Sequence, residues 1–400
     1  MNRRIKNIIA SAAAGVLAVS VAAGSLTISK SRRNSSEKVK AGFVFDGDAS
    51  TPYTANFLMA VSSLRNEYKD DIELVEKYNV PDDEADETIE QLAGQGCEII
   101  FTNSYGYGES AKKAAKEHPD IQFCAATCDN ANDDKLDNYH TFMGEIYQAR
   151  YASGAVAGAK LKELIEQDKI SEEQAVVGFV AAYPVAEVVS GYTAFLLGVR
   201  SQCESAVMKV KYINTWNNYA LEKNAADQLI NEGCIIISHH SNSIGSAIAC
   251  ENSTANHPVF HVGYNQDMST VAPRTTLTGC RIDWSRYMLD AVEAVVENKS
   301  IEKNVNGTVN GNDASGGFGE GWVKLFEINN AAAAKGSAKL ADDIRSDFEN
   351  GKVHVFKGDY TGKDINNSSD TCDLSSEYIE NEKSSAPTFH YVLDKVITIV

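Results

Sequence analysis

Short apolar runs alternate along the chain with stretches whose apolar residues recur at helical spacing. The run Val176–Val180 leads through a loop at Tyr183 and Pro184 into residues 188–199, which carry an apolar face with a helical period. A strand that feeds a helix in this way is half of a βαβ unit, and ligand sites of α/β proteins lie at the carboxyl ends of such strands. We therefore predict that this unit opens a second lobe and that its loop faces a cleft.

The same alternation recurs on both sides of that unit. A long helix is predicted over 145–165, rich in small residues that would let it approach a neighbour closely, and a polar break follows near Ser171. Strands alternating with helices indicate parallel sheets with helices on both faces, so we expect an α/β fold in two similar halves. The predicted strands lie at 40–46, 72–78, 97–102, 121–126, 139–143, 207–216, 234–238, 259–263, 277–282 and 322–326.

The last hundred residues are less regular. Residues 304–321 are rich in Gly and Asn but lack the Gly-Lys-Ser/Thr ending of a phosphate loop, so we expect a surface loop there. A closing strand is predicted over Val353–Phe356. We interpret 362–400 as a polar C-terminal tail, flexible over most of its length, with strand character only from Tyr391 onward.

The N-terminus has the pattern of an export signal. Basic residues, among them Arg3 and Arg4, precede an uncharged, Ala-rich run from Asn7 to Ser29. The run also has about the 20 residues that a membrane span needs, so an uncleaved anchor stays open as an alternative. We expect 1–38 to be a signal peptide or anchor followed by a linker, which places the rest of the chain outside the cytoplasm.

Charge and cysteine spacing exclude several classes of function. The net charge of −18 argues against a nucleic-acid partner, because phosphate binding needs a basic face. The eight cysteines form no CxxC pair and no Cys/His group with zinc-ligand spacing, so we expect structural thiols, no metal and no cofactor. One or two disulfides stay open as the alternative to free thiols. No nucleophile elbow or HExxH motif is present, so we do not expect an enzyme.

Nine stretches stand out by their order along the chain, namely Phe101–Tyr107, Glu117–Phe123, Glu145–Gly158, Tyr183–Val188, Ala194–Ser201, Asn214–Tyr219, His240–Ser243, Gly263–Met268 and Asn350–Gly358. In this shared order they resemble the basic membrane protein family of bacterial extracytoplasmic substrate-binding proteins, which serve purine or purine-nucleoside ABC transporters. Asn242 replaces an acid of the family pattern, and the apolar N-terminal run contains no cysteine for lipid attachment.

The resemblance implies a type I periplasmic-binding fold, with two Rossmann-like lobes joined by three crossovers. On this interpretation lobe I comprises 39–172 and 279–300, and lobe II comprises 173–278 and 301–361. A purine nucleoside or nucleobase would be held between aromatic rings in the cleft and delivered to an ABC transporter permease in the membrane by a monomer. A membrane-tethered sensor of the same fold, or a nucleoside-processing enzyme, are the alternatives.

Loops after the predicted strands contain the residue types that a purine site needs. Aromatic rings offer stacking faces, while amides and carboxylates fix the orientation of the base and of ribose hydroxyls. Competing structural roles remain open: Asp46 and Asp267 suit caps, Trp216 suits a core position, and Glu187 suits either a cap or a ligand amine. The candidate ligand-binding residues are Asp46, Tyr53, Asn103, Tyr105, Asp129, Tyr183, Glu187, Trp216, Asn217, His240, Asn242, Tyr264 and Asp267.

Overall fold

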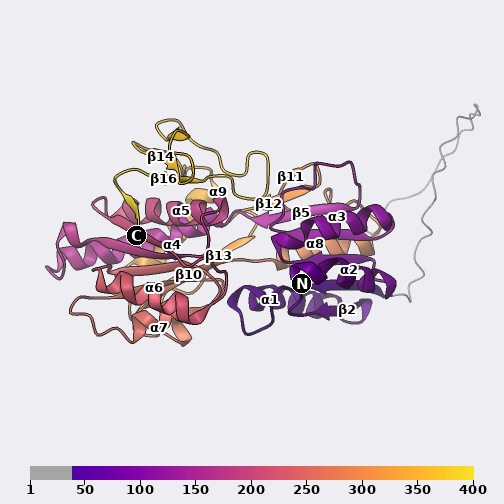
Figure 1. Ribbon diagram of the computed structural model, residues 1–400, viewed down its shortest axis with the longest axis horizontal. Helices are drawn as coiled ribbons and strands as arrows, with labels where there is room; N and C mark the ends of the chain where they lie inside the picture. The colour runs from indigo at the N-terminus through magenta and orange to yellow at the C-terminus, as the bar shows by residue number, and fades with distance from the viewer. Residues whose placement is uncertain (1–37) are drawn as a thin grey trace, which may run out of the picture. The chain divides into compact units, whose positions relative to one another are not determined.

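The computed structural model describes residues 38–400, and two seven-stranded sheets form its framework (Figure 1). The first sheet has the order β11-β12-β5-β4-β3-β1-β2, and every neighbouring pair is parallel except β11 with β12. Its strands are β1 (Val39–Val44), β2 (Ile72–Lys77), β3 (Ile99–Thr102), β4 (Gln122–Ala126), β5 (Tyr139–Gly144), β11 (Thr308–Asn310) and β12 (Asp313–Gly316). The helices of this lobe are α1 (Pro52–Tyr68), α2 (Ala85–Gly94), α3 (Gly108–Glu117) and α8 (Ser285–Val296).

The second sheet has the order β13-β10-β9-β8-β6-β7-β17 and is parallel except for β13. Its strands are β6 (Val176–Ala181), β7 (Val207–Tyr212), β8 (Ile236–His240), β9 (Phe260–Tyr264), β10 (Thr276–Ile282), β13 (Val323–Leu325) and β17 (Ile397–Ile399). The helices of this lobe are α5 (Ala186–Gln202), α6 (Tyr219–Asn231), α7 (Gly245–Glu251) and α9 (Ser337–Glu349). Two parallel-dominated sheets covered by helices confirm the predicted α/β class.

The helix α4 (Ile146–Glu166) follows β5 of the first sheet and packs on the second lobe. Ala149 and Ala152, in its first half, belong to a hydrophobic cluster that joins residues of both sheets, while Leu161 and Leu164 belong to the core of the second sheet. We expected the first crossing between lobes near 166–174, but it precedes α4, because α4 packs against α5, α9 and the strands β10 and β13.

Small residues let α4 and α5 pack closely, as the sequence predicted. A Cβ on Gly154 would lie 2.1 Å from the carbonyl oxygen of Phe195, and a Cβ on Gly158 would lie 2.2 Å from that of Val199. The contact is reciprocal, because a Cβ on Gly198 would lie 2.0 Å from the carbonyl oxygen of Tyr151. Larger side chains at these positions would force the helices apart.

Two of the expected lobe boundaries are wrong in the structure. All of β10 pairs within the second sheet, so the second crossing follows Ile282 rather than residue 278. Residues 301–316 were expected in lobe II, and 304–321 as a surface loop, yet β11 and β12 extend the first sheet next to β5. The buried Asp313 carboxylate accepts a hydrogen bond of 2.7 Å from Thr141 Oγ1, which helps to hold β12 against β5.

The C-terminal residues are part of the second lobe, so the prediction of a flexible polar tail is wrong. The strands β14 (Thr361–Asp364), β15 (Thr371–Asp373) and β16 (Tyr391–Leu393) form a small antiparallel sheet, and β17 pairs with β7. Phe389 stacks on Phe356 with ring centroids 4.2 Å apart, which buries both rings. The expected closing strand over Val353–Phe356 is not a strand, although Phe356 still packs in this core.

The cysteine side chains are free thiols, and nearly all of them are buried. All eight cysteines lie within residues 38–400, none forms a disulfide and only Cys372 is not fully buried, which confirms the prediction of structural thiols.

The predicted signal or anchor lies outside the described residues. Across residues 38–400, no helix has the length and apolar character needed to cross a membrane.

Short 3-10 turns also occur in the described part of the chain. They lie at Lys69–Asp71, Asp82–Glu84, Tyr105–Tyr107, Glu172–Gln174 and Met268–Thr270.

Candidate ligand-binding site

A cavity of about 550 Å³ is lined by loops at the carboxyl ends of strands from both sheets. The first lobe contributes loops after β1, β2, β3 and β4, and the second contributes loops after β6, β7, β8 and β9. This is the place where open parallel sheets hold their ligands. Eleven of the thirteen predicted site residues line it, namely Asp46, Tyr53, Asn103, Tyr105, Asp129, Tyr183, Glu187, Trp216, His240, Asn242 and Tyr264.

A carboxylate held by its neighbours marks the wall of the first lobe. Asn103 Nδ2 donates to Asp46 Oδ1 at 2.9 Å, and the backbone N–H of Asp46 donates back to Asn103 Oδ1 at 2.9 Å. Thr54 Oγ1 donates to the same Asp46 Oδ1 at 3.1 Å. Because Oδ1 accepts these two side-chain bonds, Oδ2 of Asp46 is left to accept a bond from a ligand.

The electrostatic environment of Asp46 reflects its position in a recess. The carboxyl group faces the open cavity, yet the surrounding protein removes part of its hydration and raises its pKa, while the hydrogen bonds from Asn103 and Thr54 oppose the rise. Asn103 itself is buried, and its carbonyl oxygen accepts a 2.5 Å bond from the hydroxyl of Tyr53. Asn103 therefore acts as a positioning residue for Asp46 and Tyr53.

Further acidic and aromatic groups form the rim of the first lobe. Tyr105 is 66% exposed, and the nearby carboxylate of Asp129 is the main cause of its raised pKa. Asp82 accepts a hydrogen bond of 3.3 Å from Ser104 Oγ, and its carboxylate lies so close to Gly106 that a Cβ there would be 2.3 Å away. Glycine at position 106 therefore lets Asp82 reach the rim of the cavity.

The wall of the second lobe is a continuous series of rings. Tyr183 lies 5.4 Å from Trp216, Trp216 lies 6.2 Å from His240, and His240 lies 4.7 Å from Tyr264, all between ring centroids. The backbone N–H of Asn242 donates to the carbonyl oxygen of Trp216 at 2.7 Å, which ties the loops after β7 and β8 together. Such rings offer flat faces on which a planar ligand can stack.

Charged groups behind this wall fix its orientation. Nε2 of His240 lies 3.2 Å from Glu187 Oε1, and burial lowers the pKa of His240 although Glu187 opposes that shift. The fully buried guanidinium of Arg150 lies 3.7 Å from the centre of the Tyr264 ring, a cation–π contact, and donates to the carbonyl oxygen of His239 at 3.1 Å. These contacts hold His240 and Tyr264 in place at the back of the cavity.

The family profile described as "ABC transporter substrate-binding protein PnrA-like" matches residues 38–320, more than half of the chain. The chain belongs to this family. The match includes every loop described above, and it confirms the resemblance to the basic membrane protein family of substrate-binding proteins.

Relatives of this PnrA-like protein support the same assignment. It is 29% identical over 324 residues to a purine-binding protein of Brucella abortus (strain 2308), covering 80% of this chain and 84% of that one. It is 28% identical over 214 residues to a Haloferax volcanii protein provisionally named as an ABC transporter glucose-binding protein, covering 54% and 50%. The structure of an Aeropyrum pernix K1 ABC transporter solute-binding protein superposes with a TM-score of 0.64 at 13% identity, covering 78% of this chain and 92% of that one. This likeness confirms the periplasmic-binding fold.

Two of the predicted site residues do not line the cavity of this PnrA-like protein. Asp267 accepts a hydrogen bond of 2.9 Å from the backbone N–H of Ser269, so it caps the short turn at Met268–Thr270. Asn217 follows Trp216 but is exposed outside the cavity. A position after a strand is therefore not sufficient evidence that a residue lines the cleft.

Other residues that line the cavity were not predicted. Asn265 directly follows β9, and its Nδ2 has no partner among the described residues although the side chain is 4% exposed. Its position after a strand could have identified it. Ala386 and Pro387 come from the C-terminal segment, which no local pattern connects with the cleft. The remaining cavity residues outside the prediction are Asp82, Ser104, Gly106, Thr127, Met143, Val185 and Ala186.

Proposed function

We propose that this substrate-binding protein captures a purine nucleoside or nucleobase in the cavity and delivers it to the permease of an ABC transporter. The observation that carries the proposal is the pairing of a wall of four rings in one lobe with an oriented carboxylate, Asp46, in the other. A purine presents a flat π face and a polar edge, and this arrangement offers partners for both.

The dimensions and polar groups of the cavity suit such a ligand. Pockets for small ligands usually have volumes of about 300–1,000 Å³, and the present cavity falls within that range. Trp216 and Tyr183 provide faces for stacking. Asp46 Oδ2 can accept a bond from a ring N–H, an exocyclic amine or a ribose hydroxyl.

The charges of the cavity favour an unphosphorylated ligand. Four carboxyl groups line it, those of Asp46, Asp82, Asp129 and Glu187, and no Lys or Arg of the described chain does. A phosphate needs cationic partners or several backbone N–H groups, and it would be repelled by these carboxylates. We therefore infer that the protein selects bases and nucleosides over nucleotides.

A sugar is the second candidate, because aromatic faces and carboxylates also suit a hexose and the Haloferax volcanii relative is named for glucose. The relative that matches 80% of this chain is named for purines, which favours the purine assignment. The family and the N-terminal charge pattern support a location outside the cytoplasm. An enzymatic role is not proposed, because the family consists of solute-binding proteins.

A thermal-shift panel tests the proposal. A ligand that binds only the folded state raises the melting temperature, and the shift grows with the logarithm of the ratio of ligand concentration to Kd once that ratio is large. We expect adenine, guanine, adenosine, guanosine or inosine to raise it, and we expect the matching nucleoside monophosphates to have little effect. A shift with hexoses alone, or with none of these compounds, would contradict the proposal.

A further inference from the structure

We propose that Asp364, Asp370 and His390 bind a divalent transition-metal ion, for which zinc is the best fit. Asp364 ends β14, Asp370 precedes β15, and His390 precedes β16, so all three belong to the small antiparallel sheet. The register of that sheet pairs Asp364 with Tyr391, which brings His390 beside Asp364 although the two are 26 positions apart in the sequence. No Cys/His spacing pattern reveals this group, because strand pairing assembles it.

The second ring nitrogen of His390 faces the two carboxylates. Nδ1 of His390 lies 2.8 Å from the carbonyl oxygen of Thr388, and a carbonyl oxygen can only accept a hydrogen bond, so Nδ1 carries a proton. Nε2 faces both Asp364 and Asp370 and forms a long hydrogen bond of 3.4 Å with Asp370 Oδ2, a contact that a bound ion would replace. Histidines that bind metals are usually oriented in this way, with the other ring N–H donating to a carbonyl or carboxylate.

Each carboxylate is held through one oxygen and presents the other. Asp364 Oδ1 accepts the backbone N–H groups of Asn366 and Asn367, and Asp370 Oδ1 accepts the hydroxyl of Tyr391 at 3.2 Å. The second oxygen of each group, Oδ2, faces His390. The three atoms that would coordinate an ion are therefore positioned by bonds to other atoms of the same side chains.

The separations of these atoms suit a tetrahedral ion. His390 Nε2 lies 3.5 Å from Asp364 Oδ2 and 3.4 Å from Asp370 Oδ2. Ligands about 2.0–2.2 Å from a tetrahedral zinc ion are about 3.3–3.6 Å from one another. Two carboxylates and a neutral imidazole also balance a divalent charge and leave a fourth position for water. Ca²⁺ and Mg²⁺ fit less well, because they prefer six or more oxygen ligands.

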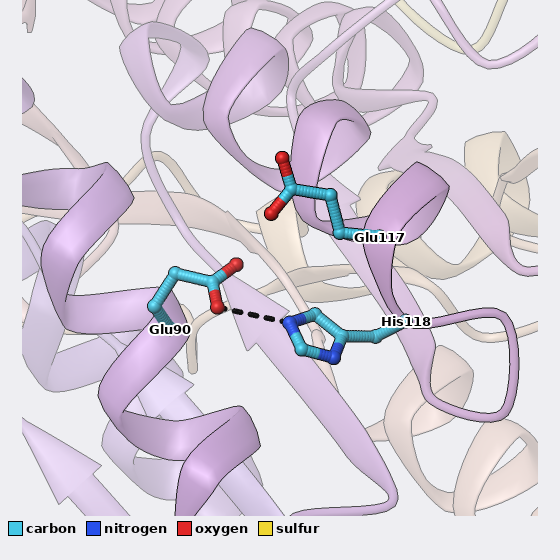
Figure 2. Close-up of side chains that lie close together, drawn as sticks. All are labelled: Glu90, Glu117 and His118. Carbon is cyan, nitrogen blue, oxygen red and sulfur yellow. Dashed lines mark hydrogen bonds and ion pairs between the residues drawn. The ribbon is translucent and has the colours of Figure 1, made fainter.

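A second group, which also consists of two carboxylates and one imidazole, differs from the first in its hydrogen bonds and atom separations (Figure 2). Glu90 lies on α2, Glu117 ends α3 and His118 follows it, and the ligand atoms of the three are close together. Figure 2 shows a direct bond between His118 Nε2 and Glu90 Oε2, which is 2.9 Å long, while Glu117 has no bond to either. At 2.9 Å the two atoms are hydrogen-bonded to each other, which is too close for two ligands of one tetrahedral ion. This group is an exposed ion pair and provides a matched control.

A bound ion would strengthen a weak part of the fold. The strands of the small sheet have only four, three and three residues, and sheets of this size need further support. An ion on Asp364, Asp370 and His390 would link all three strands. It would also anchor the chain three residues beyond Pro387, which lines the cavity.

Isothermal titration of the EDTA-treated full chain with ZnCl₂ tests the proposal. We expect one site that is lost in His390→Asn and in Asp370→Asn and unchanged in the control His118→Asn. Tyr391→Phe, which removes the bond that orients Asp370, should weaken binding about 10-fold, as is usual for such partners. Cys372→Ser should leave binding unchanged, because the half-buried thiol of this sheet is not part of the proposed site.

The outcomes are decisive in both directions. A wild-type site that depends on His390 and Asp370, together with the visible spectrum of tetrahedral Co²⁺, would support the proposal. It would be overturned if the wild-type protein showed no saturable zinc binding, or if binding survived His390→Asn and Asp370→Asn. Loss of binding in His118→Asn would also overturn it, because the ion would then occupy the other group. Circular dichroism of each variant separates loss of the site from loss of the fold.

Discussion

Asp46 and Asn103, which are 57 positions apart in the sequence, hold one another through two hydrogen bonds of 2.9 Å. The amide of Asn103 is thereby engaged with protein, and Asp46 is the group that presents a free oxygen to the cavity. Asp46 is therefore the residue of this pair that faces the ligand, and Asn103 is the residue that positions it.

Asp46→Asn should weaken purine binding by about 10- to 100-fold, because a hydrogen bond to a charged group contributes about 1.5–3 kcal/mol. Calorimetric titration of the variant with the ligand of the wild type measures the change. Asp48→Asn is the matched control, since Asp48 lies in the same loop, accepts bonds from Ser50 and Asn79, and does not line the cavity. Equal losses in the two variants would contradict the role assigned to Asp46.

Tryptophan fluorescence should report on ligand binding through a single residue. Trp284 and Trp322 are 2% and 1% exposed, whereas Trp216 is 39% exposed and lines the cavity. Stacking of a purine on Trp216 is expected to quench its emission. Trp216→Phe should abolish the ligand-dependent signal and weaken binding by about 10-fold or less, in line with about 0.5–1.5 kcal/mol for an aromatic contact. A full signal in Trp216→Phe would show that the ligand stacks elsewhere.

Acid should destabilise the second lobe through its buried histidines. Burial lowers the pKa of His239, His240 and His261 below the ordinary value of about 6.5. Below that value the unfolded chain binds more protons than the folded one, so each of these histidines reduces the unfolding free energy as pH falls, by up to about 1.4 kcal/mol per pH unit.

The contribution of one histidine can be isolated by substitution. Both ring nitrogens of His261 lack a partner among the described residues, so His261→Phe should fold and should flatten the loss of stability between pH 7 and pH 5. Denaturant titrations at several pH values measure this slope. His118→Gln, which removes an exposed ion pair, should change the slope much less. An unchanged slope in His261→Phe would contradict the assignment.

The contact of α4 with α5 predicts opposite effects for two glycine substitutions. Gly154→Ala should destabilise the protein by several kcal/mol, because the new Cβ would overlap the Phe195 carbonyl group. Gly94→Ala, in the exposed last turn of α2 with no atom within 4 Å of the new Cβ, should stabilise it by about 0.5–1 kcal/mol. Denaturant unfolding of the two variants compares them. A neutral Gly154→Ala would contradict the close packing.

The local pattern of apolar and polar residues was sufficient to predict the framework of the fold. The unit predicted around 176–200 is β6 followed by α5, because a buried apolar strand and a helical apolar period are both visible within a few residues. Many of the cavity residues that follow strands were also found, since the carboxyl ends of parallel strands converge, although Asn265 after β9 was missed. Asp46, Tyr183, Trp216 and Tyr264 all line the cavity for that reason.

The C-terminal segment could not be predicted because contacts distant in sequence hold it in place. Phe389 packs on Phe356, and Glu380 accepts bonds from the backbone of Phe389 and from Ser190 Oγ. None of these contacts produces a hydrophobic period in the sequence, so the segment shows only the polar composition that is typical of a flexible tail. Asp267 is a different case, because its contact is local: its side chain accepts the N–H of Ser269, which is the capping role that its residue type also allowed.

Isothermal titration calorimetry of the purified protein with a purine nucleoside, its free base, its monophosphate and glucose tests whether the cavity selects unphosphorylated purines. We expect saturable one-site binding of the nucleoside or base with micromolar or tighter affinity, and no detectable binding of the monophosphate or of glucose. Binding of glucose without binding of any purine would contradict it, and so would equal affinity for the nucleoside and its monophosphate.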